Sequence, residues 1–439
     1  MVAAAGLAGE IQKPAARKAG PRRGPAAGGK TVIEVTRQID LTEPQEVTLT
    51  GALIEPGTPS PLSRAALPAE PGCPRRYCTA ELNSRLPASL PGGDWRIKWQ
   101  ASLNPALPPA AIIAGADRVV TQGAGLWQLF DAAGKELAQG RLGFGEVVLD
   151  PRHRLFYALH RSNMLTAHQM SDGAAAFRTS PAYGDIFRRP FLGRAGNRLL
   201  LVGVERQIPA MPPRPPTRSL VEFIEFSEPP KVHANGLLFS VTRRGRLDLG
   251  TAKLIAAMRG ETFLLAVPGR IYLADISLNV QRAFDAEFEP LLMSLDESGR
   301  IYLVVSIGEE QKALWVLSPE GKRLGAFALK PEHQALVAPP IVGYDHRIYL
   351  LTRALVVALD AEGKLLWERP AGGAAAGAGV TVDDRLLVSA GEEIAVFDAN
   401  GERRMLYRFR GQPLLTPPVL TAAGEILVAS AQRLYCLAR

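Results

Sequence analysis

The stretch LVVALDAEGKLLW at residues 355–367 decides the fold of this chain. An alternating apolar strand runs into a polar turn, where Gly363 follows Asp360 by three residues, and a second strand ends at Trp367. Alternation on both sides of a short turn that contains glycine is typical of a β-hairpin. The stretch therefore predicts two antiparallel strands.

Related hairpins occur through the C-terminal three-quarters of the chain. They read LWQLFDAAGKEL at 126–137, IYLADISLNVQRAF at 271–284, LWVLSPEGKRLGAF at 314–327 and IAVFDANGERRML at 394–406. The turn positions Asp275, Ser318, Asp360 and Asp398 are separated by 43, 42 and 38 residues. A period near this length predicts a repeat architecture rather than a series of unrelated strands.

A second pair of strands is expected upstream of each hairpin. Pro340, Gly379 and Pro418 lie 39 residues apart, and Pro108 opens a similar stretch. Together with the hairpin, this gives three or four short strands per ~40 residues, as in one blade of a β-propeller. The expected second strands start at Arg118, Arg154, Arg198, Thr262, Arg300, Arg347, Arg385 and Glu425, with Arg270 as a rival start in the fourth unit. The fold class predicted is all-β, an eight-bladed β-propeller.

The ends of the repeat array predict how the ring closes. The last unit stops at Arg439, before the turn and outer strand that the pattern requires. Residues 95–100, WRIKWQ, match that outer strand and place Trp99 in register with Trp367. An N-terminal strand that completes the last blade would leave no long exposed sheet edge there.

Residues 1–93 differ in composition from the predicted propeller at 94–439. Residues 1–30 carry six Lys and Arg against Glu10 alone, among Ala, Gly and Pro, which predicts a disordered basic tail. Residues 31–54 alternate as two short strands outside the repeat. The proline-rich residues 55–93 predict an extended linker or a strap over the propeller.

Charge and hydropathy narrow the classes of partner. The formal net charge is +8, which allows peripheral contact with an anionic envelope surface. Basic and aromatic residues do not interleave as a nucleic-acid surface would require, so no nucleic acid is expected. No run of about 18 apolar residues exists, so no transmembrane segment is predicted.

The repeat resembles the quinoprotein-dehydrogenase-like propellers, the pyrroloquinoline-quinone (PQQ) repeat proteins, over about residues 94–439. The resemblance depends on the hairpin pattern seen at Ala358, Asp360, Gly363, Lys364 and Trp367. In that family the tryptophan of one blade packs against the hairpin of the next. Trp99 and Trp367 keep this position here, whereas three other hairpins carry Ala138, Gly325 and Met405.

The resemblance implies two branches, namely PQQ- and calcium-dependent alcohol or sugar oxidation, or a non-enzymatic scaffold such as the propeller lipoprotein of the outer-membrane barrel-assembly machinery. Many enzymes of the first branch carry adjacent cysteines, but Cys73, Cys78 and Cys436 are not adjacent. Calcium needs several converging oxygen ligands. The aspartates placed by the pattern, Asp131, Asp360 and Asp398, are instead expected to cap their own turns. We therefore assign no catalytic, cofactor-binding or metal-binding residue and no cofactor.

Two further features were weighed as sites. His153, His160 and His168 lie within one blade, but their spacings of seven and eight residues put the first two on opposite faces of any continuous strand. They are interpreted as surface or turn residues. Residues 208–218, IPAMPPRPPTR, interrupt the third blade and are interpreted as an exposed loop, with a partner contact as the alternative.

The sequence favours a periplasmic or cell-envelope location, with the cytoplasm as the alternative. Residues 2–9, VAAAGLAG, look like the end of an apolar leader without its charged start. Cys73 and Cys78 are a close pair that an oxidising compartment could join, with Cys436 left as a buried free thiol. The predicted function is a non-enzymatic scaffold for envelope protein partners, and the alternative is a PQQ-dependent or cryptic oxidoreductase.

Overall fold

A computed structural model describes residues 84–439, apart from gaps at 105–107, 124, 144–145, 152–153, 160–164, 180–187, 196–197, 206–217, 227–230, 234–235, 239–240, 249–253, 276, 286–287 and 308–310. The predictions for the basic tail, the two short strands at 31–54 and the pair Cys73 and Cys78 lie outside the described residues. So does the insertion at 208–218, except for its last residue.

The described strands form eight four-stranded sheets and one two-stranded sheet. The first four larger sheets comprise β2 (Pro109–Ala114), β3 (Arg118–Gly123), β4 (Gly125–Asp131) and β5 (Glu136–Gly143); β6 (Glu146–Asp150), β7 (Leu155–Leu159), β8 (Leu165–Gln169) and β9 (Ala175–Thr179); β10 (Arg188–Ala195), β11 (Arg198–Glu205), β12 (Arg218–Phe226) and β15 (Val241–Asp248); and β16 (Ile255–Arg259), β17 (Thr262–Val267), β18 (Arg270–Asp275) and β19 (Val280–Asp285). The small sheet pairs β13 (Lys231–His233) with β14 (Gly236–Leu238).

The other four larger sheets follow the same antiparallel plan. They comprise β20 (Glu289–Leu295), β21 (Ile301–Ile307), β22 (Gln311–Leu317) and β23 (Arg323–Leu329); β24 (Ile341–Val342), β25 (Ile348–Leu351), β26 (Leu355–Leu359) and β27 (Leu365–Pro370); β28 (Ala375–Val380), β29 (Leu386–Ala390), β30 (Glu393–Phe397) and β31 (Arg403–Arg408); and β32 (Val419–Leu420), β33 (Ile426–Ala429), β34 (Arg433–Ala438) and β1 (Arg96–Ser102). A short 3₁₀ helix, η2 (Pro331–His333), lies between β23 and β24.

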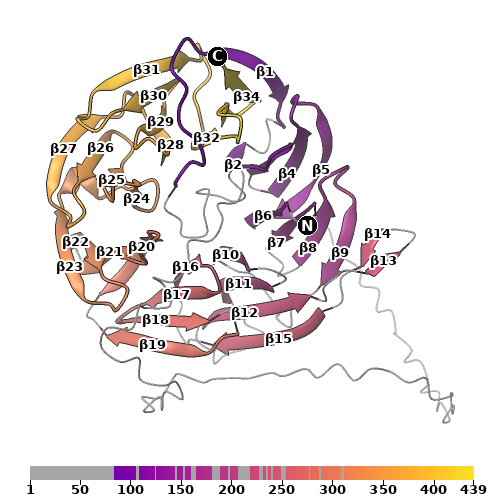
Figure 1. Ribbon diagram of the computed structural model, residues 1–439, viewed down its shortest axis with the longest axis horizontal. Helices are drawn as coiled ribbons and strands as arrows, with labels where there is room; N and C mark the ends of the chain where they lie inside the picture. The colour runs from indigo at the N-terminus through magenta and orange to yellow at the C-terminus, as the bar shows by residue number, and fades with distance from the viewer. Residues whose placement is uncertain are drawn as a thin grey trace, which may run out of the picture. The chain divides into compact units, whose positions relative to one another are not determined.

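These sheets are arranged around a ring. The innermost strand is the one named first for each sheet above, which is β32 in the closing sheet (Figure 1). Innermost strands of successive sheets contact one another from β2 through β6, β10, β16, β20 and β24 to β28, and β32 contacts β2. The predicted all-β propeller is confirmed. Each expected second-strand start lies at, or one residue before, the second strand of a four-stranded sheet. In the fourth unit Thr262 starts that strand, and the rival Arg270 starts the third.

The ring closes through the N-terminal strand, as predicted. β1 is the outermost strand of the last sheet and pairs with β34 along its whole length, from Arg96 opposite Ala438 to Ser102 opposite Arg433. Trp99 lies opposite Cys436 in this pairing. The two ends of the chain's repeat array therefore share one sheet.

The hairpins turn as their sequences predict. In the turn after β26, the Gly363 amide donates to the Asp360 carbonyl, and Gly363 has a φ of 87°. A positive φ is one that glycine adopts without steric cost, which explains the glycine three residues after the aspartate. The register of β26 and β27 shifts beside this turn, which marks a β-bulge.

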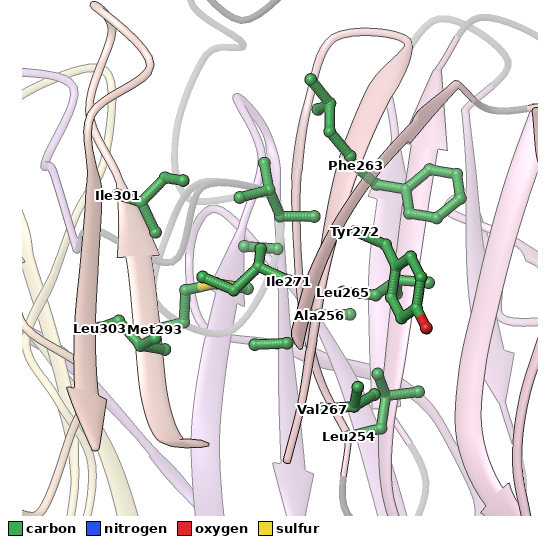
Figure 2. Packing of buried hydrophobic residues seen from close by; sticks show 14 of the residues in the cluster. Leu254, Ala256, Phe263, Leu265, Val267, Ile271, Tyr272, Met293, Ile301 and Leu303 are labelled. Carbon is green, nitrogen blue, oxygen red and sulfur yellow. The ribbon is translucent and has the colours of Figure 1, made fainter. Parts of the chain in front are cut away.

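The core lies between the sheets rather than in one central mass. Figure 2 shows one such layer, in which Met293, Ile301 and Leu303 of one sheet pack near Ile271 and Leu265 of the preceding sheet. All five side chains are buried. Four other clusters join further pairs of neighbouring sheets in the same way, which is the packing that alternating strands with one apolar face per neighbour produce.

The two tryptophans that keep the repeat position pack on the next hairpin, as the resemblance implied. The Trp367 indole nitrogen donates to the Ala399 carbonyl at 3.0 Å, and its ring lies against Gly401. Trp99 of β1 lies against Gly134, in the hairpin of the first sheet. One tryptophan thus joins neighbours inside the array, and the other joins its first and last sheets.

The three positions without tryptophan each have a separate explanation. Ala138 touches Gly173 of the next hairpin, and Trp127 from a neighbouring strand fills the space beside it. At Gly325 the next hairpin comes so close that an added Cβ would lie 1.7 Å from the Glu362 carbonyl oxygen. Met405 is half exposed because the next sheet is the closing one, whose outer strands β34 and β1 are not joined by a hairpin.

Candidate functional site

Residues 84–93, which we name the strap, run across the turns that join first and second strands in the last four sheets. The Leu86 amide donates to the Val380 carbonyl at 2.7 Å, and the Val380 amide donates to the Ser84 carbonyl at 3.0 Å. The Val382 amide donates to the Ala88 carbonyl at 3.3 Å. The strap prediction for the proline-rich segment thus holds for these residues, which pack on the ring although the sheets begin at Arg96.

Arg85 anchors the strap to two neighbouring sheets. Its Nε donates to the Val342 carbonyl at 2.9 Å, and one terminal nitrogen donates to the Gly343 carbonyl at 2.5 Å. The other terminal nitrogen pairs with the Glu297 carboxylate, and the guanidinium carbon lies 4.5 Å from the centre of the Tyr344 ring. The side chain is buried, so its positive charge is removed from water and is compensated by the carbonyls, the carboxylate and the aromatic ring around it.

Asp296 lies beneath this anchor as a fully buried carboxylate. One oxygen accepts from the backbone amides of Ser298 and Arg300, which makes an Asx turn. The other accepts from the Tyr302 hydroxyl at 2.9 Å and lies 3.2 Å from His346 Nδ1. Burial, and secondly the charge of Asp296, raise the pKa of the Tyr302 hydroxyl, so the phenol stays protonated as a donor.

His346 completes the polar cluster from the next sheet's turn. Its φ of 63° is in the left-handed region, which a non-glycine residue adopts only when its surroundings hold it there. One ring nitrogen faces Asp296, and Nε2 lies 4.0 Å from a Glu297 oxygen. The imidazole therefore lies between two carboxylates and links the two turns that hold Arg85.

The predicted turn role of the hairpin aspartates is confirmed. Oδ1 of Asp131 accepts from the backbone amides of Ala133 and Lys135, both at 2.9 Å. Asp360 and Asp398 each accept in the same way from the residues two and four positions later. These three carboxylates belong to separate sheets, so the structure does not bring them together.

Of the three histidines weighed as ligands, His153 and His160 lie outside the described residues. His168 is stacked on Phe156 and tilted against Trp127. Its ring nitrogens lie 3.0 Å from the Gly173 carbonyl and 2.9 Å from the Thr166 hydroxyl. Burial lowers the pKa of this imidazole, which packs between its own strand and Trp127 of the preceding sheet, so the prediction of a surface or turn residue is wrong for His168.

Cys436 is a free, buried thiol, as predicted. It lies on β34, and Glu425 Oε2 is 3.6 Å from its sulfur. Burial, followed by the charge of Glu425, raises the pKa of the thiol to about 12. Thiolate is the nucleophilic form of cysteine, so this position is inert at neutral pH.

Within the part of the chain that the structure describes, no three His, Cys, Asp or Glu side chains gather in a way that could hold a metal ion. The same residues include no helix long and apolar enough to cross a membrane.

Sequence reasoning missed the polar cluster of Arg85, Asp296, Glu297, Tyr344 and His346. Tight polar turns are expected between first and second strands, but the sequence does not predict that their side chains gather into a site. Asp296 carries the same signal as the hairpin aspartates, with Gly299 three residues later. For Arg85 no local signal exists, because its partners are more than 200 residues away along the chain.

Comparison with known proteins bears on the fold. No protein-family model matches this chain, and no curated protein matches it. Among solved structures, BamB from Moraxella catarrhalis aligns with a TM-score of 0.51 and 15% identity, covering 79% of this chain and 98% of that one. Saccharomyces cerevisiae Sqt1 aligns with a TM-score of 0.56 and 11% identity, covering 76% and 97%.

A europium-containing methanol dehydrogenase aligns with a TM-score of 0.58 and 10% identity, covering 84% of this chain and 98% of that one. At such low identity these likenesses concern the fold. They agree with the resemblance to PQQ-repeat propellers that the hairpins carry. Because the same fold appears in a dehydrogenase and in proteins of other kinds, function has to be argued from the site.

Proposed function

We propose that this protein is a non-enzymatic propeller scaffold that binds protein partners in the bacterial cell envelope, in the assembly of outer-membrane or surface complexes. The main support for this proposal is the role of the polar side chains that contact the strap. Arg85, Glu297 and Asp296 are matched to one another and to backbone groups, so they hold chain segments in place.

The scaffold is proposed as a single ring in which all eight four-stranded sheets are blades. Each blade then presents its own turns and its outer strand, and specificity lies in those loops. Exposed apolar side chains occur on such outer strands, for example Leu324 on β23 and Leu366 on β27, which are 41% and 47% exposed. A ring of this kind offers a broad surface for protein contact.

An envelope location is proposed from the sequence of the N-terminal region. The leader-like residues 2–9 and the close cysteines Cys73 and Cys78 favour export to an oxidising compartment. The net charge of +8 suits contact with an anionic envelope surface. Fractionation of the native cell tests this proposal, since recovery in the cytoplasm would support the alternative location.

Partner binding is proposed to use the N-terminal segment. Residues 31–54 alternate like strands outside the repeat, and two isolated strands are marginal in water. Deleting residues 1–54 should abolish co-purification with envelope proteins and leave the propeller folded by circular dichroism. Retained binding would move the interaction to the ring itself.

The rival function is a PQQ-dependent or otherwise cryptic oxidoreductase. The test is dye reduction by purified protein supplied with PQQ, Ca²⁺ and an alcohol or sugar, together with PQQ binding followed by absorbance. We expect neither turnover nor saturable binding. PQQ-dependent dye reduction would overturn the scaffold proposal.

A further inference from the structure

The strap lies on the ring without being part of a four-stranded sheet. It is held by an isolated parallel bridge between Arg85 and Val380, by a second backbone contact from Val382 to Ala88, and by the buried side chains of Arg85, Leu86 and Leu90. A short bridge of this kind contributes little by itself, because most of a strand's stability comes from neighbours on both sides. Side chains therefore provide most of the contact, and the most selective among them are Arg85 and Leu86.

The arginine subsite matches a guanidinium in shape and charge. Two carbonyl oxygens, from Val342 and Gly343, accept from Nε and one terminal nitrogen, and Glu297 takes the other terminal nitrogen. The Tyr344 ring covers the guanidinium face. A lysine has no planar fork to satisfy two carbonyls and a carboxylate at once, so this arrangement is selective for arginine.

The leucine subsite lies directly beside it. The Leu86 side chain is fully buried and faces Gly379, where an added Cβ would lie 2.9 Å from it. The Leu86 carbonyl accepts from the Tyr344 hydroxyl at 3.2 Å, and its amide donates to Val380. The ring thus recognises both side chains of an extended Arg-Leu pair and the backbone between them.

The site is at the surface rather than inside the ring. The Glu297 side chain is 45% exposed and Tyr344 is 37% exposed, although both contact the strap. Val382, on the strap's other side, is 45% exposed. Apolar and acidic groups therefore border the strap where another chain could reach them.

We propose that the ring face formed by the turns 296–300, 343–347 and 380–384 is a docking site for an extended peptide of a partner protein in which arginine is followed by a leucine-sized apolar residue. The strap occupies this site in cis and competes with the partner. The inference rests on the proposed scaffold function, for which it names the kind of partner segment that the ring recognises.

The test uses the full chain and a labelled peptide with the sequence of residues 81–92, ELNSRLPASLPG. In wild type the tethered strap is present at an effective concentration near the millimolar range, so the peptide competes poorly. In the double variant Arg85→Ser, Leu86→Ser the site is vacated. Fluorescence anisotropy should then show peptide binding at least ~10-fold tighter than in wild type.

Matched variants assign that binding to the site. In the vacated background, Glu297→Gln should weaken peptide binding, whereas Glu362→Gln, at an exposed hairpin turn, should not change it. A peptide with alanine in place of its arginine should bind at least ~10-fold more weakly, because the subsite's carbonyls and carboxylate lose their donor. Arg85→Lys keeps the charge but not the fork, and it should give an intermediate affinity. It also serves as the folded comparison if the double variant unfolds.

Equal peptide affinity in wild type and in every folded strap variant would overturn the docking site. Peptide binding that does not depend on the peptide's arginine or on Glu297 would do the same. These outcomes are separate from the scaffold proposal, which PQQ-dependent dye reduction by the purified protein would overturn.

Discussion

The sheet β24–β27 and the closing sheet have the same four-stranded plan but are held together differently. In the first, the outer two strands are joined by a hairpin whose register is set by Asp360 and Gly363. In the closing sheet, β34 and β1 come from opposite ends of the array. Their pairing is backbone pairing between two distant segments, to which Trp99 against the next hairpin and the ion pair between Lys98 and Glu425 add side-chain contacts. The outer strand β1 is thus held on the closing sheet without a hairpin turn that joins it to β34.

The largest effect should come from removing the closing strand. Deleting residues 1–103 takes away β1 and the buried side chains of Leu86, Leu90, Trp95 and Leu103, each worth about 1.5–3 kcal/mol. It also leaves β34 as a free edge. We expect the melting temperature to fall by many degrees and the protein to self-associate, as measured by calorimetry and light scattering.

Deletion of residues 1–30 is the control, because those residues precede both the strap and β1. We expect its melting temperature to stay close to that of the full chain. If both truncations were equally stable, closure by β1 would contribute nothing to the ring.

Trp367→Ala and Trp99→Ala remove the same side chain from the two kinds of sheet. Trp367 is buried and its loss should destabilise the protein by about 3–5 kcal/mol in urea denaturation, whereas Trp99 is only partly buried and its loss should cost less. Met405→Ala, at the same repeat position but half exposed, should stay within ~0.5 kcal/mol. The two tryptophan variants should differ in which sheet undergoes local unfolding.

Cys436 reports that opening, since it lies opposite Trp99 in the β1 and β34 pairing. Its buried thiol has a pKa raised to about 12, so labelling at neutral pH requires local unfolding. Trp99→Ala should speed modification of the Cys436 peptide, followed by mass spectrometry, and Trp367→Ala should speed it less. Equal acceleration by both would mean that the closing sheet does not open independently.

Gly325→Ala tests the contact between two neighbouring hairpins whose backbones approach closely, without a tryptophan between them. A Cβ there would meet the Glu362 carbonyl oxygen at 1.7 Å, and the backbone of a hairpin cannot easily move away. We expect a loss of about 1–3 kcal/mol in urea denaturation. Gly92→Ala is the control, because an added Cβ there has nothing within 4 Å. A neutral Gly325→Ala would show that this junction is loose.

The sequence predicts the hairpins, the second-strand starts and the closure because each depends on local pattern. Alternation sets the strands, and the Asp360 and Gly363 spacing sets the turn. The same local reasoning cannot place Arg85, since the carbonyls that bind it belong to backbone at Val342 and Gly343, whose side chains carry no signal. The role of Gly325 cannot be predicted from the sequence either. The absence of a tryptophan at this position suggests a degenerate repeat, whereas the structure shows that the two neighbouring hairpins approach more closely there.

The smallest effect should come from the ion pair that bridges β1 to the last sheet. Lys98 Nζ lies 2.5 Å from Glu425 Oε1, but half of the lysine side chain is exposed, so the pair is worth roughly 0–1 kcal/mol. Lys98→Met should lower stability by that amount, and the difference from wild type should shrink in high salt. Lys364→Met, at an exposed hairpin turn, should show no such salt dependence.

The pH dependence of this pair has a definite sign. The hydrogen bond to Glu425, and then its charge, raise the pKa of the Lys98 ammonium above its ordinary value of 10.5. A raised pKa means that the contribution is fully present below the unfolded value and is lost as pH rises through the folded value. The gap between wild type and Lys98→Met in urea should therefore stay constant from pH 7 to 9 and narrow above about 10.5. A gap that stays unchanged as the pH rises above about 10.5 would show that Lys98 contributes through packing of its methylene stem and not through its charge on Glu425.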